Sequence, residues 1–251
     1  MRARAGSEGV RAAPSPGGRT RGVRPSPRAL WAGPGAWRAL AAGGSGAVEI
    51  ALHPGGYARL GVHWLLIAHA RAPRGPLSLL VTGLEGAPLA VGDAVTVGHE
   101  LRAGALRIDL SRLAPPLALV PPPLAPGWRA ALRAAIAEVP PPAFTSVREE
   151  ALAGRGEGLT PAGDDVLAGY AAWRHAEGRP VRFAGDRCSP LGLAYLRCAE
   201  RGELPEAAAR VLVAIRAGDV AAARRRARAL SGWGASSGTA ILWGMAAGAR
   251  E

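Results

Sequence analysis

The chain has 251 residues, 49% of them hydrophobic, and a formal net charge of +12. This is enough for a sizeable core in one large domain or two small ones. Two cysteines exclude a disulfide framework, and no apolar run approaches the roughly 18 residues of a membrane span, so we expect a cytoplasmic protein. All basic residues are arginines, in a chain dominated by Ala, Gly, Pro and Arg, which weakens the inference from charge to nucleic acid.

The N-terminal segment, residues 1–30, is rich in Arg, Pro, Gly and Ser and shows no apolar periodicity. Its first 28 residues contain seven arginines and one glutamate, a net charge of +6 that is half of the total. We predict a disordered tail and no signal peptide. Two alternatives are a functional basic arm and a start codon assigned upstream of the true one.

Residues 31–113 are predicted to form a β-rich domain, either an antiparallel sheet or a small barrel. Short apolar or alternating runs are separated by glycine-rich turns, which is typical of these folds. The predicted strands lie at residues 47–52, 58–68, 77–81, 94–97 and 106–110.

A proline cluster at residues 114–126 excludes a helix or a central strand, and we predict a linker there. After it, apolar periodicity and short loops predict a helical domain over residues 127–251. The fold class is therefore α+β, with a β-rich, barrel-like N-terminal region followed by helices. The expected helices span residues 128–139, 161–177, 190–201, 205–217, 220–230 and 237–249.

The stretch most suited to chemistry is the glycine-rich segment 154–165, Gly-Arg-Gly-Glu-Gly-Leu-Thr-Pro-Ala-Gly-Asp-Asp. Its alternating glycines permit backbone conformations closed to other residues. Thr160 before Pro161 predicts a helix start, with the hydroxyl as its cap. Free N–H groups at such a start bind anions, so we predict that Gly158, Thr160 and Gly163 contact a phosphate or carboxylate. A well-capped helix with a flexible approach loop is the alternative.

Two adjacent acids, Asp164 and Asp165, lie in the first turn of this helix. They favour the helix dipole but repel a bare anion. If these aspartates are functional, they accept a proton, accept hydrogen bonds from an amide or ammonium group, or bind a metal. We predict Asp164 and Asp165 as catalytic residues without a cofactor, and a divalent metal at this pair is left open as an alternative.

The pattern Gly-x-x-β-branched-Leu-x-Gly occurs twice. Residues 163–169 read Gly-Asp-Asp-Val-Leu-Ala-Gly, and residues 238–244 read Gly-Thr-Ala-Ile-Leu-Trp-Gly. Both copies follow hydroxyl side chains, and the second glycine of each allows close helix contact. We predict that the two helix starts face one pocket, with Ser236, Ser237 and Gly238 contacting the same ligand. Because glycine is abundant throughout, coincidence is the alternative.

Residues 158–169 resemble the signature of the AllH-type family, whose named member is a subunit of oxamate carbamoyltransferase in anaerobic allantoin breakdown. Residues 189–202 and the serine-glycine motif at 234–238 resemble the middle and C-terminal segments of that family. The family motif often has a histidine where Ala235 stands and an acid where Ala240 stands.

The resemblance implies a component of an enzyme of purine catabolism that converts oxalurate and phosphate into oxamate and carbamoyl phosphate, in an assembly with other subunits. The implied ligand is a small carboxylate, an amide or carbamoyl phosphate. The departure at Ala240 favours an alternative, in which the chain is a non-catalytic subunit that binds such a ligand or has a regulatory role. A third hypothesis, nucleic-acid binding through the basic tail, ranks last because no aromatic platform or recognition helix accompanies the charge.

Overall fold

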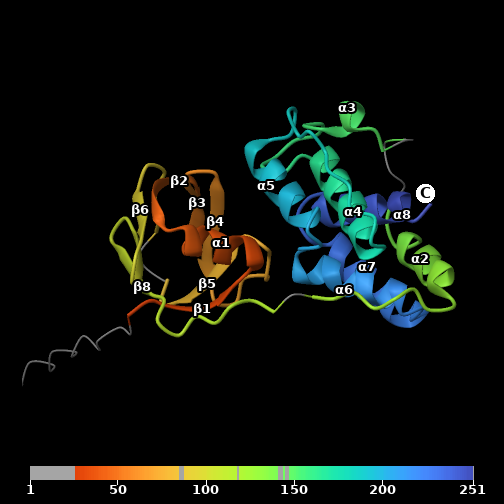
Figure 1. Ribbon diagram of the computed structural model, residues 1–251, viewed down its shortest axis with the longest axis horizontal. Coiled ribbons are helices and arrows are strands. Elements are labelled where there is room, and N and C mark those ends of the chain that lie inside the picture. Colours follow the sequence, from red (N-terminus) through yellow and green to blue (C-terminus); the bar gives the residue numbers. More distant parts are fainter. Residues whose placement is uncertain (1–25, 85–87, 118, 141–143, 145–146, 251) are drawn as a thin grey trace, which may run out of the picture.

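A β-barrel and a group of packed helices follow one another along the chain (Figure 1), as the α+β prediction requires. The computed structural model describes residues 26–84, 88–117, 119–140, 144 and 147–250. The first 25 residues of the predicted tail therefore lie outside the described residues.

The described strands close into a barrel in the order β1-β5-β4-β3-β2-β6-β7-β8. Neighbouring strands are antiparallel except for β1 with β8 and β4 with β5, which are parallel, so the expected antiparallel sheet is correct for most of the barrel. The strands are β1 (Arg28–Ala32), β2 (Gly44–Leu52), β3 (Gly55–Leu60), β4 (His63–His69), β5 (Ser78–Thr82), β6 (Ala94–Val97), β7 (Glu100–Ala103) and β8 (Leu106–Asp109).

Three features of the barrel differ from the sequence prediction. The run 58–68 is a hairpin rather than one strand, because Gly61 turns the chain at a φ of 58° and leaves Val62 exposed. The strand β1 begins at Arg28, inside the predicted tail, and the short strand β7 was not predicted. Both are too short to show a clear alternation by themselves.

The helix α1 (Pro34–Ala42) was also missed. Pro34 in its first turn and Gly43 after its end are the usual boundary signals of a helix, but five of the eight residues between them are alanine or glycine. Ala36 and Ala39 are fully buried in the core of the barrel, so α1 covers the barrel instead of linking it to another unit.

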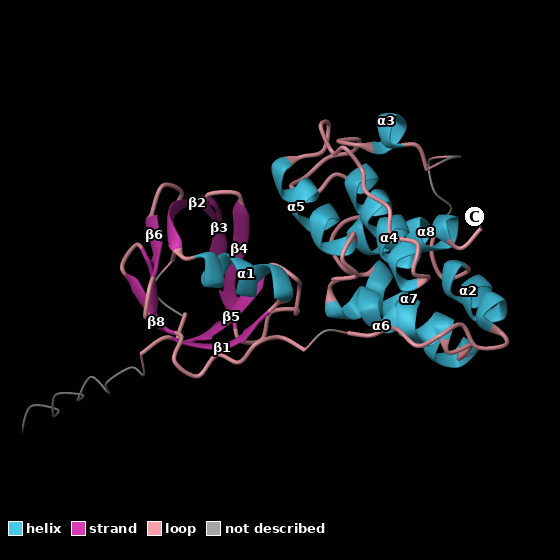
Figure 2. Cartoon of the chain, viewed as in Figure 1, coloured by secondary structure: helices cyan, strands magenta, loops and turns pink. Residues whose placement is uncertain are grey.

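The helices predicted for the C-terminal half all form, and Figure 2 shows them gathered beside the barrel. A short additional helix, α3, precedes the glycine-rich loop. Trp173, Leu212 and Ile215 are among the largest side chains buried in the helical core. The helices are α2 (Trp128–Ile136), α3 (Glu149–Leu152), α4 (Ala162–Ala176), α5 (Pro190–Ala199), α6 (Glu206–Arg216), α7 (Val220–Ser231) and α8 (Ser237–Gly248).

The helices α4 and α8 cross in close contact at the two glycines that the repeated pattern singled out. A Cβ atom on Gly169 would lie 2.0 Å from the carbonyl oxygen of Ile241, and one on Gly244 would lie 2.1 Å from that of Val166. These separations are far shorter than any van der Waals contact, so only glycine fits at either position. The predicted close contact of the two helices is confirmed.

The barrel and the helices share a layer of side chains. Tyr57 and Trp64 from the barrel form one hydrophobic cluster with Leu191 and Cys198 of α5. At the edge of this cluster Arg38 of α1 donates two hydrogen bonds to the Glu203 carboxylate. The boundaries proposed for the domains stay a prediction.

Burial raises the pKa of Cys198, and likewise of Cys188, to about 12, so both thiols stay protonated at neutral pH. None of the helices in the described ranges combines the length and apolarity needed to cross a membrane.

Candidate functional site

The glycine-rich loop has the unusual backbone that its sequence predicts. Gly154, Gly156 and Gly158 have φ angles of 73°, 115° and 93°, in the region where only glycine is unstrained. Gly158 is exposed, whereas Gly163 packs so closely that a Cβ on it would lie 1.8 Å from the carbonyl oxygen of Leu152. The loop is therefore held against α3 and the start of α4.

The start of α4 differs from the prediction in its cap. Pro161 is the N-cap residue, and Thr160 makes no capping hydrogen bond. Pro161 has an extended ψ of 143°, so the helix begins one residue later than predicted, at Ala162. The N–H groups of Asp164 and Asp165 donate to the Pro161 carbonyl, and that of Gly163 donates to Arg155. These three N–H groups, which the sequence predicted to be free for an anion, therefore already donate to carbonyl oxygens of the protein.

The Asp164 carboxylate holds two loops against α4 by hydrogen bonds. It is 1% exposed, and its two oxygens accept hydrogen bonds from the N–H of Gly154 at 2.7 Å and of Ser189 at 2.9 Å. Ser189 in turn caps α5 by accepting from the Gly192 N–H. Both oxygens are used within the protein, so this carboxylate positions the loops around the site.

Replacing Asp164 should therefore destabilise the fold. In Asp164→Ala two buried N–H groups lose a charged acceptor, and we expect the free energy of unfolding to fall by about 3 kcal/mol. Chemical denaturation measures this. Asp186→Ala is the control, because Asp186 is exposed on the neighbouring loop, and it should change stability by less than about 0.5 kcal/mol. Equal effects in the two variants would contradict the positioning role.

The Asp165 carboxylate has a different environment. It is 5% exposed, and its Oδ2 atom has no hydrogen-bond partner among the described residues. The pKa of Asp165 is raised to about 7, because burial and the negative charge of Asp164 together outweigh the lowering effect of the hydroxyls of Ser237 and Thr160. Near neutral pH this carboxyl group can therefore either accept or donate a proton.

Asp165 lines a cavity of about 240 Å³, which we call the Asp165 pocket, between α4, α5, α8 and β3. Thr160 and Ser237 lie together on its wall, with their hydroxyl oxygens 3.4 Å apart. This pair brings the starts of α4 and α8 together at the pocket wall. Apolar side chains complete the wall, among them Leu159, Leu191, Leu204, Trp233 and Ile241.

Two tyrosines complete the polar part of the Asp165 pocket. The hydroxyl oxygens of Tyr57 from β3 and Tyr195 from α5 are 3.0 Å apart. Burial raises the pKa of both, and most strongly that of Tyr195, so both are protonated. One hydrogen lies between the two oxygens, and the other O–H can donate to a ligand. Sequence reasoning missed both residues, because nothing in their local pattern links a barrel strand to α5.

The other predicted site residues lie elsewhere. Gly163 and Ser236 line a separate cavity of about 280 Å³ on the far side of the α4–α8 crossing, together with Arg155 and Ala240. The Gly238 N–H donates to the Trp233 carbonyl oxygen. Of the predicted residues, the structure thus brings Thr160, Asp165 and Ser237 into one pocket.

The Asp165 pocket suits a small neutral polar group. No arginine is among the described residues that line it, and its other acid, Glu203, is paired with Arg38. A phosphate dianion would find no cation here, whereas an amide could donate to Asp165 and accept from the hydroxyls. Within the described residues, no three His, Cys, Asp or Glu side chains are grouped to hold a metal ion.

Part of the chain matches a known protein family. The model of the family described as oxamate carbamoyltransferase subunit AllH matches residues 152–249, which run from the end of α3 to the end of α8. The resemblance predicted from the glycine-rich sequence is therefore confirmed for these residues. No curated protein and no solved structure matches the chain.

Proposed function

We propose that this chain, whose helical region matches the AllH subunit family, holds the amide or carbamoyl end of a small substrate in the Asp165 pocket of an oxamate carbamoyltransferase-type assembly. The observation that carries the proposal is the buried Asp165 carboxyl group, with one oxygen unpartnered and two hydroxyls beside it. A group with this burial and pKa in a cavity is typical of a site that binds or reacts.

In this proposal each polar group has a distinct role. Asp165 faces the amide nitrogen, where its ionised form accepts an N–H hydrogen bond and its neutral form can donate a proton. The hydroxyls of Thr160, Ser237 and the tyrosine pair donate to the carbonyl or carboxylate oxygens. The apolar walls exclude water, which strengthens these bonds. The cavity of about 240 Å³ fits a molecule the size of oxamate or oxalurate.

The proposed reaction step uses the proton of Asp165. An oxygen of hydrogen phosphate attacks the carbamoyl carbon of oxalurate, and the bond from that carbon to the oxamate nitrogen breaks. The neutral Asp165 carboxyl group donates its proton to this nitrogen, and the hydrogen phosphate returns one proton to the carboxylate. A pKa of about 7 suits both transfers. Because the described part of the pocket wall supplies no arginine, the proposal requires other groups, from this chain or from a partner subunit, to hold the phosphate.

A second candidate function is a subunit that binds the amide without catalysis. None of the described residues lining the pocket is an arginine, which favours it, because a transfer to phosphate needs charge neutralisation close to the reacting carbon. Ala240, where the family motif often has an acid, lines the separate cavity, so its substitution bears on that cavity and leaves the Asp165 pocket intact.

Calorimetric titration of oxamate and oxalurate tests the proposed pocket. We expect saturable binding to the wild type and about fivefold to tenfold weaker binding to Ser237→Ala, which loses one hydrogen bond to the ligand. Ser236→Ala is the matched control and should bind as the wild type does, because Ser236 lines the other cavity. Absence of binding to the wild type, or equal losses in the two variants, would refute the pocket. Turnover of oxalurate with phosphate by the assembled subunits then separates catalysis from binding alone.

A further inference from the structure

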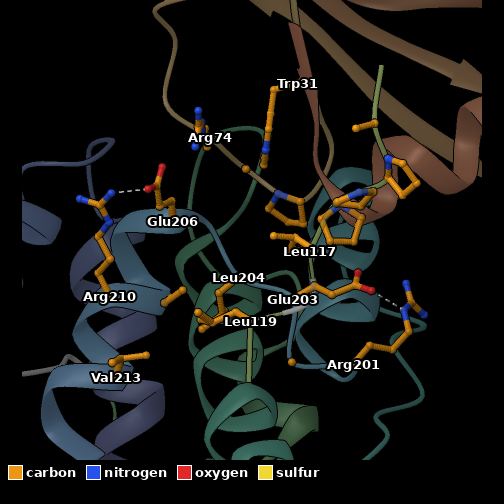
Figure 3. A pocket seen from close by; sticks show the side chains of 18 of the residues that line it. Trp31, Arg74, Leu117, Leu119, Arg201, Glu203, Leu204, Glu206, Arg210 and Val213 are labelled. Carbon is orange, nitrogen blue, oxygen red and sulfur yellow. Dashed lines mark hydrogen bonds and ion pairs between the residues drawn. The ribbon is translucent and has the colours of Figure 1, made fainter. Parts of the chain in front are cut away.

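A cavity of about 900 Å³ lies between the barrel, the linker and α6, and the function proposed above does not use it. Figure 3 shows Leu117, Leu119 and Leu204 in its middle, between the Arg210–Glu206 pair on one side and the Arg201–Glu203 pair on the other. Trp31 and Arg74 reach into it from the barrel. The cavity thus combines an apolar floor with charged ends.

Positive charge is concentrated at one end. Arg74 before β5, Arg210 on α6 and Arg226 on α7 line both this cavity and an adjoining one of about 280 Å³, so the three arginines surround one place. The Glu206 carboxylate also lines both cavities, and it forms an ion pair with Arg210. Among the described carboxylates, none forms an ion pair with Arg74 or Arg226. This leaves two positive charges uncompensated at the shared wall.

The fold brings these arginines together from distant parts of the chain. The Glu206 N–H donates to the Arg74 carbonyl oxygen at 2.9 Å, which holds the start of α6 against the barrel loop. The Arg226 guanidinium donates to the Arg210 carbonyl oxygen at 2.9 Å, which holds it over α6. The cluster is therefore built by tertiary contacts, unlike the run of arginines along α7 itself.

An aromatic surface lies beside this cluster. The guanidinium carbon of Arg74 is 5.3 Å from the centre of the Trp31 ring, in a cation–π contact. A flat ring can stack on a tryptophan or on a guanidinium plane, and arginines bind phosphate oxygens with forked hydrogen bonds. A ligand that uses both features carries a phosphate and an aromatic ring.

We propose that this cavity binds a nucleoside phosphate, with its phosphate groups at Arg74, Arg210 and Arg226 and its base against Trp31 and the leucine floor. The cavity has the volume of a nucleotide site, whereas the Asp165 pocket is too small for one. Glu203 and Leu204 line both cavities, so an occupied nucleotide site contacts the wall of the Asp165 pocket. This inference does not depend on the function proposed for Asp165.

Calorimetric titration of ADP into the full-length chain tests this site, with pyrophosphate and adenosine as separate probes. We expect ADP to bind at least about tenfold more tightly than either probe, because only ADP engages both the arginines and Trp31. Trp31→Leu should reduce the advantage of ADP over pyrophosphate. If pyrophosphate binds as tightly as ADP, the base contact is refuted, and if ADP shows no saturation the site itself is refuted.

Two neighbouring arginines provide the matched variants. Arg226→Gln should weaken ADP binding about tenfold or more, because it removes a charged contact to the phosphate groups. Arg225→Gln removes the same charge from the same helix. Both arginines are exposed, but Arg225 lies outside the cavity lining, so this substitution should leave binding unchanged. Equal losses in the two variants would show attraction by the overall positive charge and would overturn the proposed site.

Discussion

At pH 8, Asp165→Asn is expected to be more stable than the wild type by about 2–4 kcal/mol, although it removes a group from the proposed site. The reason is linkage. Burial raises the pKa of Asp165 to about 7, so the folded protein binds this proton more tightly than the unfolded chain, in which the pKa is about 4. The stabilisation that the protonated form provides is complete below about pH 4. It is lost as the pH rises toward 7, and the loss levels off above that pH.

The measurement is the difference in free energy of unfolding between wild type and variant at several pH values, from chemical denaturation. The difference should be close to zero near pH 4 and grow through pH 7, because asparagine has no proton to lose. Asp164→Asn is the control from the next residue. It should be destabilised across the whole range, because both oxygens of Asp164 accept backbone hydrogen bonds. A pH-independent difference for Asp165→Asn would contradict the raised pKa.

The same variant tests the proposed chemistry. If Asp165 donates the proton to the leaving nitrogen, Asp165→Asn in the assembled enzyme should lower kcat by about 100-fold or more, in the range of general acid catalysis. If the variant is more stable but has a lower kcat, the buried carboxyl group lowers stability and is retained for turnover. Unchanged turnover would refute the proton transfer by Asp165, whereas its proposed role in binding would still hold.

The second large effect is expected at the α4–α8 crossing. Gly169→Ala should lower the free energy of unfolding by about 3 kcal/mol or more, because its Cβ would lie 2.0 Å from the Ile241 carbonyl oxygen and the helices would have to separate. The separation would also move Ser237 away from Thr160, so oxamate binding should weaken in the variant that still folds. Thermal unfolding and calorimetry measure the two effects.

Gly98→Ala is the matched control for this substitution. Gly98 lies between β6 and β7 with nothing within 4 Å of an added Cβ and without a positive φ angle. The alanine should therefore be neutral or slightly stabilising, through the smaller entropy of the unfolded chain. A similar loss in both variants would mean that the effect of Gly169→Ala does not come from the helix contact.

The sequence predicted the features that depend on local pattern. The C-terminal helices have apolar residues at helical spacing and proline or glycine at their ends, so their positions were predicted to within a few residues. The alternating glycines of residues 154–158 predicted a backbone with positive φ angles, and the repeated glycine pattern predicted the crossing of α4 and α8. The elements α1, β1 and β7 were not predicted. A segment rich in alanine and glycine, such as α1, shows little apolar periodicity, and strands of four or five residues are too short to show it.

The roles of the two aspartates could not be separated from the sequence, because they are adjacent and of one type. Asp164 meets the N–H groups of two loops distant in sequence, whereas Asp165, about 100° further round the same helix, faces a cavity. Burial raises the pKa of Asp165, and burial exists only in the folded chain. The sequence alone therefore determined the six longer helices of the C-terminal half and the crossing of α4 and α8. Only tertiary packing, by bringing Tyr57 and Tyr195 to Asp165 and Arg74 to Arg226, decided which polar groups share a cavity.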